Sequence, residues 1–204
     1  MNLLRAASTI SLLTLASRIT GLVRDQLIAA QFGAGALTDA FNVAFRLPNL
    51  LRRLFAEGAF SQAFVPFLAA TRERDGDDAT QALIDAVATV LLWVLLLTCV
   101  AGVAAAPVLI WLLAAGLQEF DLAVLMARWM FPYIGCMSLV ALSAGILNTW
   151  RRFAVPALTP VLLNLSLIGA AWLGVPLFEA WGQPPILALA AGVMLGGLLQ
   201  LAVQ

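Results

Sequence analysis

Six long apolar stretches dominate this chain of 204 residues and decide which solvent it can fold in. They cover residues 3–30, 36–70, 82–105, 122–147, 155–177 and 185–203. A bilayer core about 30 Å thick is crossed by roughly 20 helical residues, so each stretch can span it. Because lipid offers no partner to the backbone, the crossing segments should be helices. We therefore predict an all-α, polytopic membrane protein with one six-helix domain, 1–204. A shorter apolar run, 107–117, is predicted to lie at the membrane interface.

The overall composition agrees with a membrane protein and excludes several functions. The chain is 63% hydrophobic and 11% charged, and its mean hydropathy is +0.99, outside the usual range of a soluble domain. A net charge of zero gives no basic excess for nucleic acid, so no nucleic-acid partner is expected. Histidine is absent, which removes the commonest metal ligand and general base. We expect no metal site, no catalytic residue and no cofactor.

The positions of the arginines predict how the helices are oriented. Positive residues that flank transmembrane helices stay on the cytoplasmic side. Arginines occur near the N-terminus and in the connections 71–80 and 148–153, and the intervening connections carry none. These five are Arg5, Arg72, Arg74, Arg151 and Arg152. The sequence thus predicts a cytoplasmic N-terminus. Since Gln204 directly follows the sixth stretch, we also expect the chain to be part of a longer protein.

Charged side chains inside the first stretch are its most informative feature. Arg18, Arg24 and Asp25 lie about 15 to 22 residues from Leu3, well inside the bilayer at 1.5 Å per residue. An arginine near the bilayer centre costs at least ~2.5 kcal/mol, so each needs a partner or a water-filled cavity. With Ser17 they follow helical spacing, which predicts one polar face.

The second stretch repeats this pattern. Its polar face comprises Asp39, Asn42, Arg46, Asn49 and Arg53, with Arg52 and Glu57 on an adjoining face. These groups could form ion pairs between helices or reach the lipid head groups. However, the deep arginines, Arg18, Arg24 and Arg52, have only Asp25, Asp39 and Glu57 nearby as balance, which favours an anionic ligand in a shared cavity.

Two blocks of residues resemble a known family. The first block comprises Ser17-Arg18, Gly21, Arg24-Asp25, Gly33-Ala34-Gly35, Thr38-Asp39-Ala40-Phe41, Pro48-Asn49, Arg52-Arg53, Phe55-Ala56-Glu57-Gly58-Ala59-Phe60 and Phe64-Val65-Pro66. The second comprises Ile146-Leu147-Asn148-Thr149-Trp150, Arg152-Phe153, Pro156-Ala157, Pro160 and Leu163-Asn164. Together they resemble the N-terminal half of the MurJ (MviN) family, within the multidrug/oligosaccharidyl-lipid/polysaccharide exporter superfamily.

The resemblance implies a fold and a function. The fold has two six-helix lobes around a cationic cavity, with two further helices, and this chain matches the first lobe. The function would be transport of lipid II, the undecaprenyl-pyrophosphate-linked disaccharide-pentapeptide, across the bacterial inner membrane. Its partners would be lipid II, membrane lipids and other cell-wall synthesis proteins. By the motif, the substrate-binding residues would be Ser17, Arg18, Arg24, Asp25, Asn49 and Arg52, and the gating residues Asp39 and Glu57.

We hypothesise alternating access, in which Arg24 and Arg52 bind the pyrophosphate, Arg18 adds to the field and Asp25 orients an arginine. Asp39 would act as an outer gate. An exporter of another polyprenyl-linked glycan fits the same pattern, whereas a cation exporter would need acidic groups in the cavity. A membrane enzyme acting on polyprenyl pyrophosphate would need a base or nucleophile, for which Ser17 and Glu57 are the candidates. A purely structural scaffold leaves the buried arginines unexplained.

Overall fold

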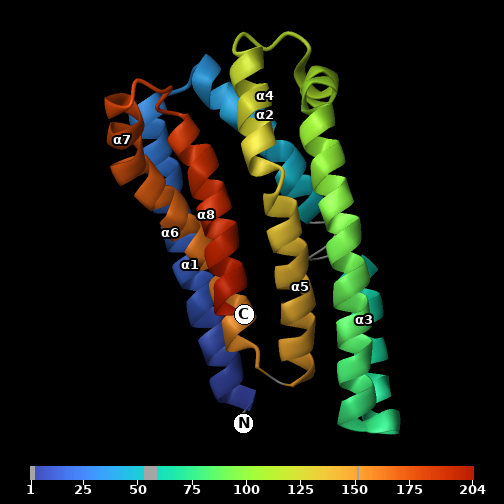
Figure 1. Ribbon diagram of the computed structural model, residues 1–204. Helices are drawn as coiled ribbons and strands as arrows, with labels where there is room; N and C mark the ends of the chain where they lie inside the picture. The colour runs from blue at the N-terminus through green and yellow to red at the C-terminus, as the bar shows by residue number, and fades with distance from the viewer. Residues whose placement is uncertain (1–2, 53–58, 151) are drawn as a thin grey trace.

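The computed structural model of this chain describes residues 3–52, 59–150 and 152–204, with only the backbone of 3–7, 51–52 and 59–62. The described residues form helices and no strand, which confirms the predicted all-α fold (Figure 1). The helices are α1 (Leu3–Phe32), α2 (Ala36–Arg52), α3 (Ala59–Ala114), α4 (Phe120–Met130), α5 (Tyr133–Thr149), α6 (Ala154–Gly169), the π-helix η2 (Ala170–Gly174), α7 (Val175–Ala180) and α8 (Leu187–Val203).

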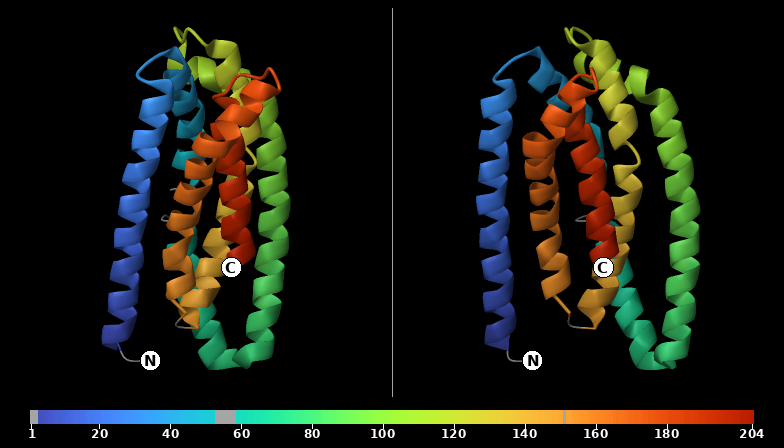
Figure 2. Two further views of the ribbon diagram at one scale, coloured as in Figure 1. Left: turned by 90° about the vertical axis from the view of Figure 1, so that its left-hand side faces the viewer. Right: turned by 60° about the vertical axis from the view of Figure 1, so that its left-hand side comes forward.

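Helix α3 is a helical hairpin rather than one straight helix. The chain descends through 59–75, reverses at Gly76 and ascends through 77–114 (Figure 2). Gly76 has a φ of 85°, a left-handed conformation that residues with a Cβ rarely adopt. The expected connection 71–80 is therefore helical on both sides of one glycine. The run 107–117, expected as a separate interfacial piece, instead continues α3 as far as Ala114, because Pro107 does not end the helix.

The fourth and fifth predicted stretches are each interrupted in the structure. Phe131 and Pro132 separate α4 from α5, since a proline has no N–H to continue the helical hydrogen bonds. In the fifth stretch, α6, η2 and α7 form one rod with a π-helical turn from Ala170 to Gly174. Such turns insert an extra residue into an α-helix.

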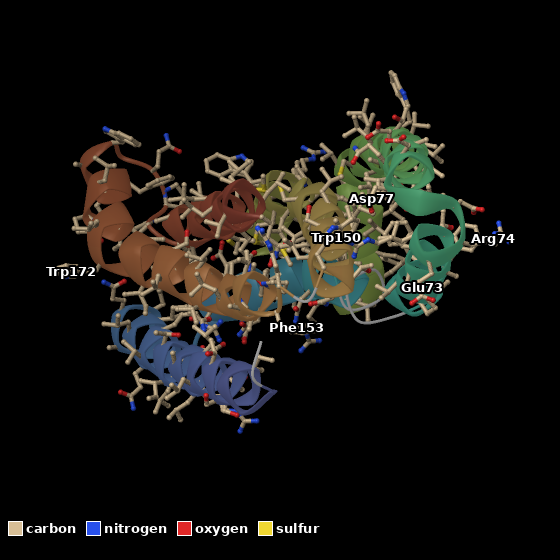
Figure 3. All side chains as sticks on the ribbon, turned by 90° about the horizontal axis from the view of Figure 1, so that it is seen from below. Glu73, Arg74, Asp77, Trp150, Phe153 and Trp172 are labelled. Atoms are coloured by element: carbon tan, nitrogen blue, oxygen red, sulfur yellow. The ribbon has the colours of Figure 1, made fainter. Side chains whose placement is uncertain are left out.

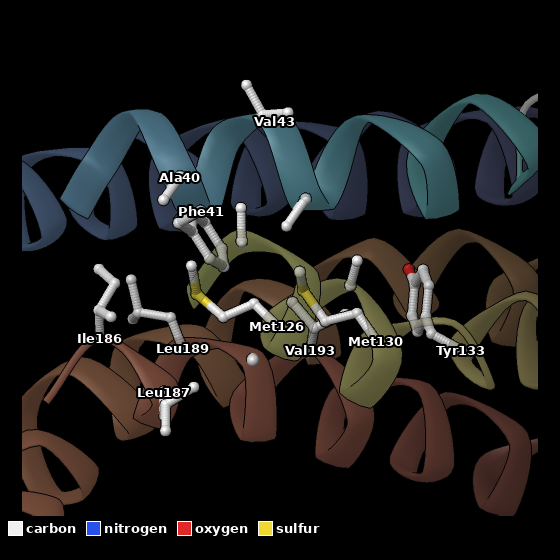
Figure 4. Packing of buried hydrophobic residues seen from close by; sticks show 14 of the residues in the cluster. Ala40, Phe41, Val43, Met126, Met130, Tyr133, Ile186, Leu187, Leu189 and Val193 are labelled. Atoms are coloured by element: carbon white, nitrogen blue, oxygen red, sulfur yellow. The ribbon is translucent and has the colours of Figure 1, made fainter. Parts of the chain in front are cut away.

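The core lies where α8 meets its neighbours. Helix α8 packs against α4, α5 and α6, while α1 packs along α6. Figure 4 shows this core, which joins residues of α2, α4, the start of α5 and α8. Its fully buried members include Met126, Met130, Ile186 and Leu189. The packing fixes α6 between α1 and α8, which determines the walls of the cavity described below.

The outer surface is strongly apolar. Trp93, Leu97 and Leu112 of α3 are 62%, 67% and 67% exposed, and Trp172 of η2 is 69% exposed. A protein in water rarely exposes such continuous apolar area. Three described helical segments are long and apolar enough to cross a membrane, namely Ala63–Ala114, Phe120–Thr149 and Ala154–Ala180, and Leu187–Val203 is a shorter apolar helix. The exposed apolar surface therefore suits contact with lipid chains.

The connections that carry described arginines lie together at one end of the bundle. The start of α1, the reversal at Gly76, the end of α5 and the start of α6 share this end, opposite 33–35, 115–119 and 181–186 (Figure 1). Viewed from this end, Arg74, Asp77 and Trp150 lie on the α3 side (Figure 3). The Arg72 guanidinium carbon is 4.4 Å from the centre of the Trp150 ring, a cation–π contact that joins the two connections.

Candidate functional site

A polar cavity of about 460 Å³ opens between the helices. Its walls come from α1, α2, α5, α6 and α8. Its polar lining residues are Ser17, Arg18, Arg24, Asn49, Tyr133, Thr159, Asn164, Gln200 and Gln204. Among the described residues that line it, Arg18 and Arg24 carry the charge and none is acidic. The cavity thus presents positive potential inside an apolar bundle, a setting that attracts an anion.

Arg24 is held by two neighbours of different kinds. Its Nε and Nη2 donate to Oδ1 of Asp25 at 2.9 and 2.7 Å, and its Nη1 donates to Oδ1 of Asn164 at 2.8 Å. These bonds use three of the five N–H donors of a guanidinium. The Arg24 side chain is 26% exposed and that of Asp25 is 64% exposed. Arg24 is therefore oriented by fixed partners while part of it still faces open space.

Asn164 connects Arg24 to the backbone of α1. Its Nδ2 donates to the Ser17 carbonyl at 2.9 Å and to Oγ1 of Thr20 at 3.2 Å. Since a carbonyl oxygen can only accept, the NH2 of this amide faces α1 and its oxygen faces Arg24. Asn164 is 6% exposed. This side chain from α6 thereby fixes the guanidinium and ties α6 to α1.

A second, smaller cavity of about 250 Å³ lies on the other side of Arg24. Its lining includes Asp25, Thr38 and Asn42. Arg24 and Phe45 line both cavities. The Phe45 ring stacks on Phe41 with centroids 5.8 Å apart and tilts against Tyr133 at 6.3 Å. One arginine and one packed aromatic ring thus lie at the boundary between the two spaces.

The structure brings part of the predicted site together. Ser17, Arg18, Arg24 and Asn49 line the larger cavity, and Asp25 lines the smaller one. Asp39 is exposed in the first turn of α2, away from the lining of both cavities, where its charge complements the helix dipole.

Two of the predicted site residues cannot be placed in this way. The Arg52 side chain and all of Glu57 lie outside the described part of the chain.

Residue-by-residue reasoning from the charges missed two polar side chains of the cavity. Asn164 and Gln200 are 6% and 2% exposed and come from α6 and α8. A signal existed in the sequence, because Gln200 is the one polar side chain within the apolar stretch 185–203. Placing an uncharged polar side chain in a membrane helix costs less free energy than placing a charged one. A lone glutamine is therefore a weaker indication of a functional site than an arginine. Only the packing of α6 between α1 and α8 places these two amides in the same cavity as the arginines.

Comparison with known proteins identifies the family. The family model described as Lipid II flippase MurJ matches residues 28–204. A lipid II flippase MurJ from Burkholderia cenocepacia is 53% identical over all of this chain and 40% of its own length. A probable lipid II flippase MurJ from Vibrio cholerae is 44% identical over 99% of this chain and 40% of its own length. The chain therefore spans about two fifths of the relatives that it matches.

A solved structure supports the same assignment. The structure described as lipid II flippase MurJ in an inward closed conformation superposes with a TM-score of 0.76 at 29% sequence identity. The match covers 95% of this chain and 41% of the solved one. With its apolar helices, this makes the chain part of a multi-pass membrane protein. The chain belongs to the Lipid II flippase MurJ family.

Proposed function

We propose that this chain is the N-terminal lobe of a flippase that moves lipid II from the cytoplasmic to the periplasmic leaflet. The observation that carries the proposal is the charge of the larger cavity, where Arg18 and Arg24 face a space without an acidic lining residue among those described. The pyrophosphate of lipid II carries the opposite charge, and the sugar-peptide head group of lipid II needs a polar path through the membrane. The names of the relatives support this substrate.

Arg24 and Arg52 bind the pyrophosphate in this proposal, and Arg18 adds to the field. Charge-assisted hydrogen bonds from guanidinium groups replace the hydration that the phosphates lose on entering the cavity. The contacts of Arg24 with Asp25 and Asn164 support this role, because a guanidinium already held in place loses less entropy on binding. Ser17 and Asn49 line the same space and offer uncharged hydrogen-bond partners.

Transport proceeds by alternating access, without covalent chemistry. The head group passes the boundary formed by Arg24 and Phe45, which line both cavities, while the polyprenyl tail stays in lipid. Asp39, at the end of the bundle that holds the 33–35 connection, acts as an outer gate by pairing with an arginine when that side closes. Glu57 acts as a second gating residue.

The protein lies in the bacterial inner membrane with a cytoplasmic N-terminus. The shared end of the connections that carry described arginines supports this orientation (Figure 1), since positive residues are retained on the cytoplasmic side. Other cell-wall synthesis proteins are further partners, because lipid II is made on one side of this membrane and consumed on the other.

Complementation tests the proposal. The full-length gene replaces the only lipid II flippase of a depleted bacterium, as wild type, Arg24→Ala or Arg74→Ala, and lysis is scored. We expect rescue by wild type and by Arg74→Ala, because Arg74 is exposed at the reversal of α3, where it pairs with Asp75 at 3.0 Å. Cells that carry Arg24→Ala should lyse even when the variant is present in the membrane at the wild-type level.

Other outcomes would contradict specific parts of the proposal. Lysis of cells that express the wild-type protein would indicate that it transports a different glycan lipid. Rescue by Arg24→Ala would show that Arg24 is not needed for substrate binding.

A further inference from the structure

Gln200 of α8 forms part of the cavity wall opposite the arginines. It is 2% exposed and lines the same space as Arg18 and Arg24. Helix α6 packs against both α1 and α8, so the amide and the arginines reach the cavity from different sides of α6. Gln200 therefore places a polar side chain in the wall of the space that the two arginines also line.

The orientation of the Gln200 amide follows from a single contact. Its Nε2 donates to the Thr159 carbonyl at 2.6 Å. Because a carbonyl oxygen cannot donate, the NH2 must face α6, and the oxygen of the amide lies on the other side. Among the described residues, Oε1 of Gln200 is buried with no hydrogen-bond partner. A buried acceptor in this state destabilises the protein until a donor reaches it.

The Pro156 carbonyl of α6 is satisfied within its own helix. Pro160 lacks an N–H, which leaves the Pro156 carbonyl without its usual helical partner. The Thr159 hydroxyl donates to this carbonyl at 2.8 Å. The Thr159 hydroxyl and carbonyl are thus both bonded, whereas the Oε1 acceptor of Gln200 is left without a partner among the described residues.

We propose that Oε1 of Gln200 accepts a hydrogen bond from an uncharged donor of the transported head group, a sugar hydroxyl or an amide N–H. The inference rests on the proposed function and deepens it. Phosphate oxygens only accept, so they belong with the arginines of α1, whereas an amide oxygen can bind only the donor-bearing part of the substrate. The cavity then recognises the two chemical parts of one ligand on separate walls.

A purely structural role for Gln200 is the competing explanation, and the chain contains a matched control for it. Ser166 of α6 donates its hydroxyl to the Gly192 carbonyl of α8, also at 2.6 Å. This bond joins the same two helices, but Ser166 lines an apolar groove rather than the polar cavity. If both contacts only tie the helices, their loss should have the same effect on ligand binding.

Binding of two ligands to the full-length protein in nanodiscs separates these roles. The ligands are undecaprenyl pyrophosphate and complete lipid II, and the variants are Gln200→Met, Ser166→Ala and Arg24→Ala. We expect Gln200→Met to weaken lipid II binding about 3- to 10-fold, the loss of one hydrogen bond, with unchanged binding of undecaprenyl pyrophosphate. Ser166→Ala should leave the ratio of the two affinities as in wild type, and Arg24→Ala should weaken both.

Each other result overturns a defined statement. If Gln200→Met weakened the binding of both ligands equally, or of neither, only the proposed role of Gln200 would be overturned. The proposed function itself would be overturned if the wild-type protein bound neither ligand. It would also be overturned if Arg24→Ala weakened the binding of neither ligand. If Gln200→Met does not fold, Gln200→Leu decides, since leucine also lacks both polar groups of the amide. It should weaken lipid II binding and leave the binding of undecaprenyl pyrophosphate unchanged, and an unchanged ratio of the two affinities would overturn the inference.

Discussion

Asn164 shows how one uncharged residue can determine what an arginine does. It accepts from Arg24 and donates to the Ser17 carbonyl, so the position of the guanidinium depends on the distance between α6 and α1. A charge-assisted hydrogen bond of this kind contributes about 1.5 to 3 kcal/mol. Asp25, 64% exposed, is screened by solvent and holds Arg24 less firmly. Asn164 is therefore the main positioning residue of this site.

We predict that Asn164→Leu weakens the binding of undecaprenyl pyrophosphate to the full-length protein roughly tenfold, since about 1.4 kcal/mol corresponds to a factor of ten. Leucine keeps the branched shape of the side chain but removes all three of its hydrogen bonds. Calorimetric titration in detergent would measure the change. Thr20→Val is the control, because it removes the 3.2 Å bond to Nδ2 and the bonds of the Thr20 hydroxyl to the Ala16 and Ser17 carbonyls of its own helix, and leaves the contact with Arg24. An equal loss in both variants would show that Asn164 acts only by joining the helices.

Between helices, small residues decide which elements meet. Gly192 and Gly196 of α8, four residues apart, face α6, the spacing that lets two membrane helices approach closely. An added Cβ at Gly192 would lie 2.6 Å from the Cβ of Ala170, and one at Gly196 would lie 3.3 Å from the Cα of Leu163. This close packing brings Gln200 within reach of Thr159.

We predict that Gly192→Ala destabilises the protein by about 1 to 3 kcal/mol, the usual cost of overpacking, because its methyl group meets a second methyl group of the neighbouring helix. Thermal unfolding in detergent, followed by intrinsic tryptophan fluorescence, would show a lower midpoint. Gly169→Ala is the control. It has nothing within 4 Å of the added Cβ, and alanine favours helix by about 1 kcal/mol, so its midpoint should stay equal or rise. The same midpoint for both variants would contradict the packing explanation.

For the individual helices, the sequence predicts that they form but not where each one bends. Apolar stretches of about 20 residues predicted α1 and α8 well, since lipid leaves the backbone no alternative to helix. The reversal lies inside the predicted connection 71–80, but hydropathy could not single out Gly76, because a left-handed backbone at one glycine does not change the hydropathy of the segment. A proline in the sequence also does not predict a helix end by itself. The helix is interrupted at Pro132 but continues through Pro107, since neighbouring helices decide whether a proline ends a helix.

The whole molecule has two chemically different ends. One holds the start of α1, the reversal at Gly76, the end of α5 and the start of α6, and the other holds 33–35, 115–119 and 181–186 (Figure 1). Arg72 and Arg74 lie at the first end, and the connections of the second carry no arginine. The retention of positive residues on the cytoplasmic side then predicts the orientation of the complete lobe.

Labelling with a membrane-impermeant maleimide in intact cells tests this orientation. In the full-length protein with Cys99→Ala and Cys136→Ala, Gly116→Cys should react and Asp78→Cys should not, because both positions are exposed but lie at opposite ends. Both should react after lysis, which controls for accessibility. Reaction of Asp78→Cys alone in intact cells would reverse the orientation.

The sequence by itself determined the solvent, the helical class and the presence of arginines that need a partner or a water-filled cavity, because hydropathy and insertion cost depend on residue type and local spacing alone. The resemblance of its motifs also implied one substrate site of Ser17, Arg18, Arg24, Asp25, Asn49 and Arg52, of which Ser17, Arg18, Arg24 and Asn49 line the larger cavity. Only the tertiary structure decided that Asn164 and Gln200 join them and that Asp25 faces a second space. The physical reason is that these positions depend on how closely α1, α6 and α8 pack, and that distance is set by contacts between residues far apart in the chain.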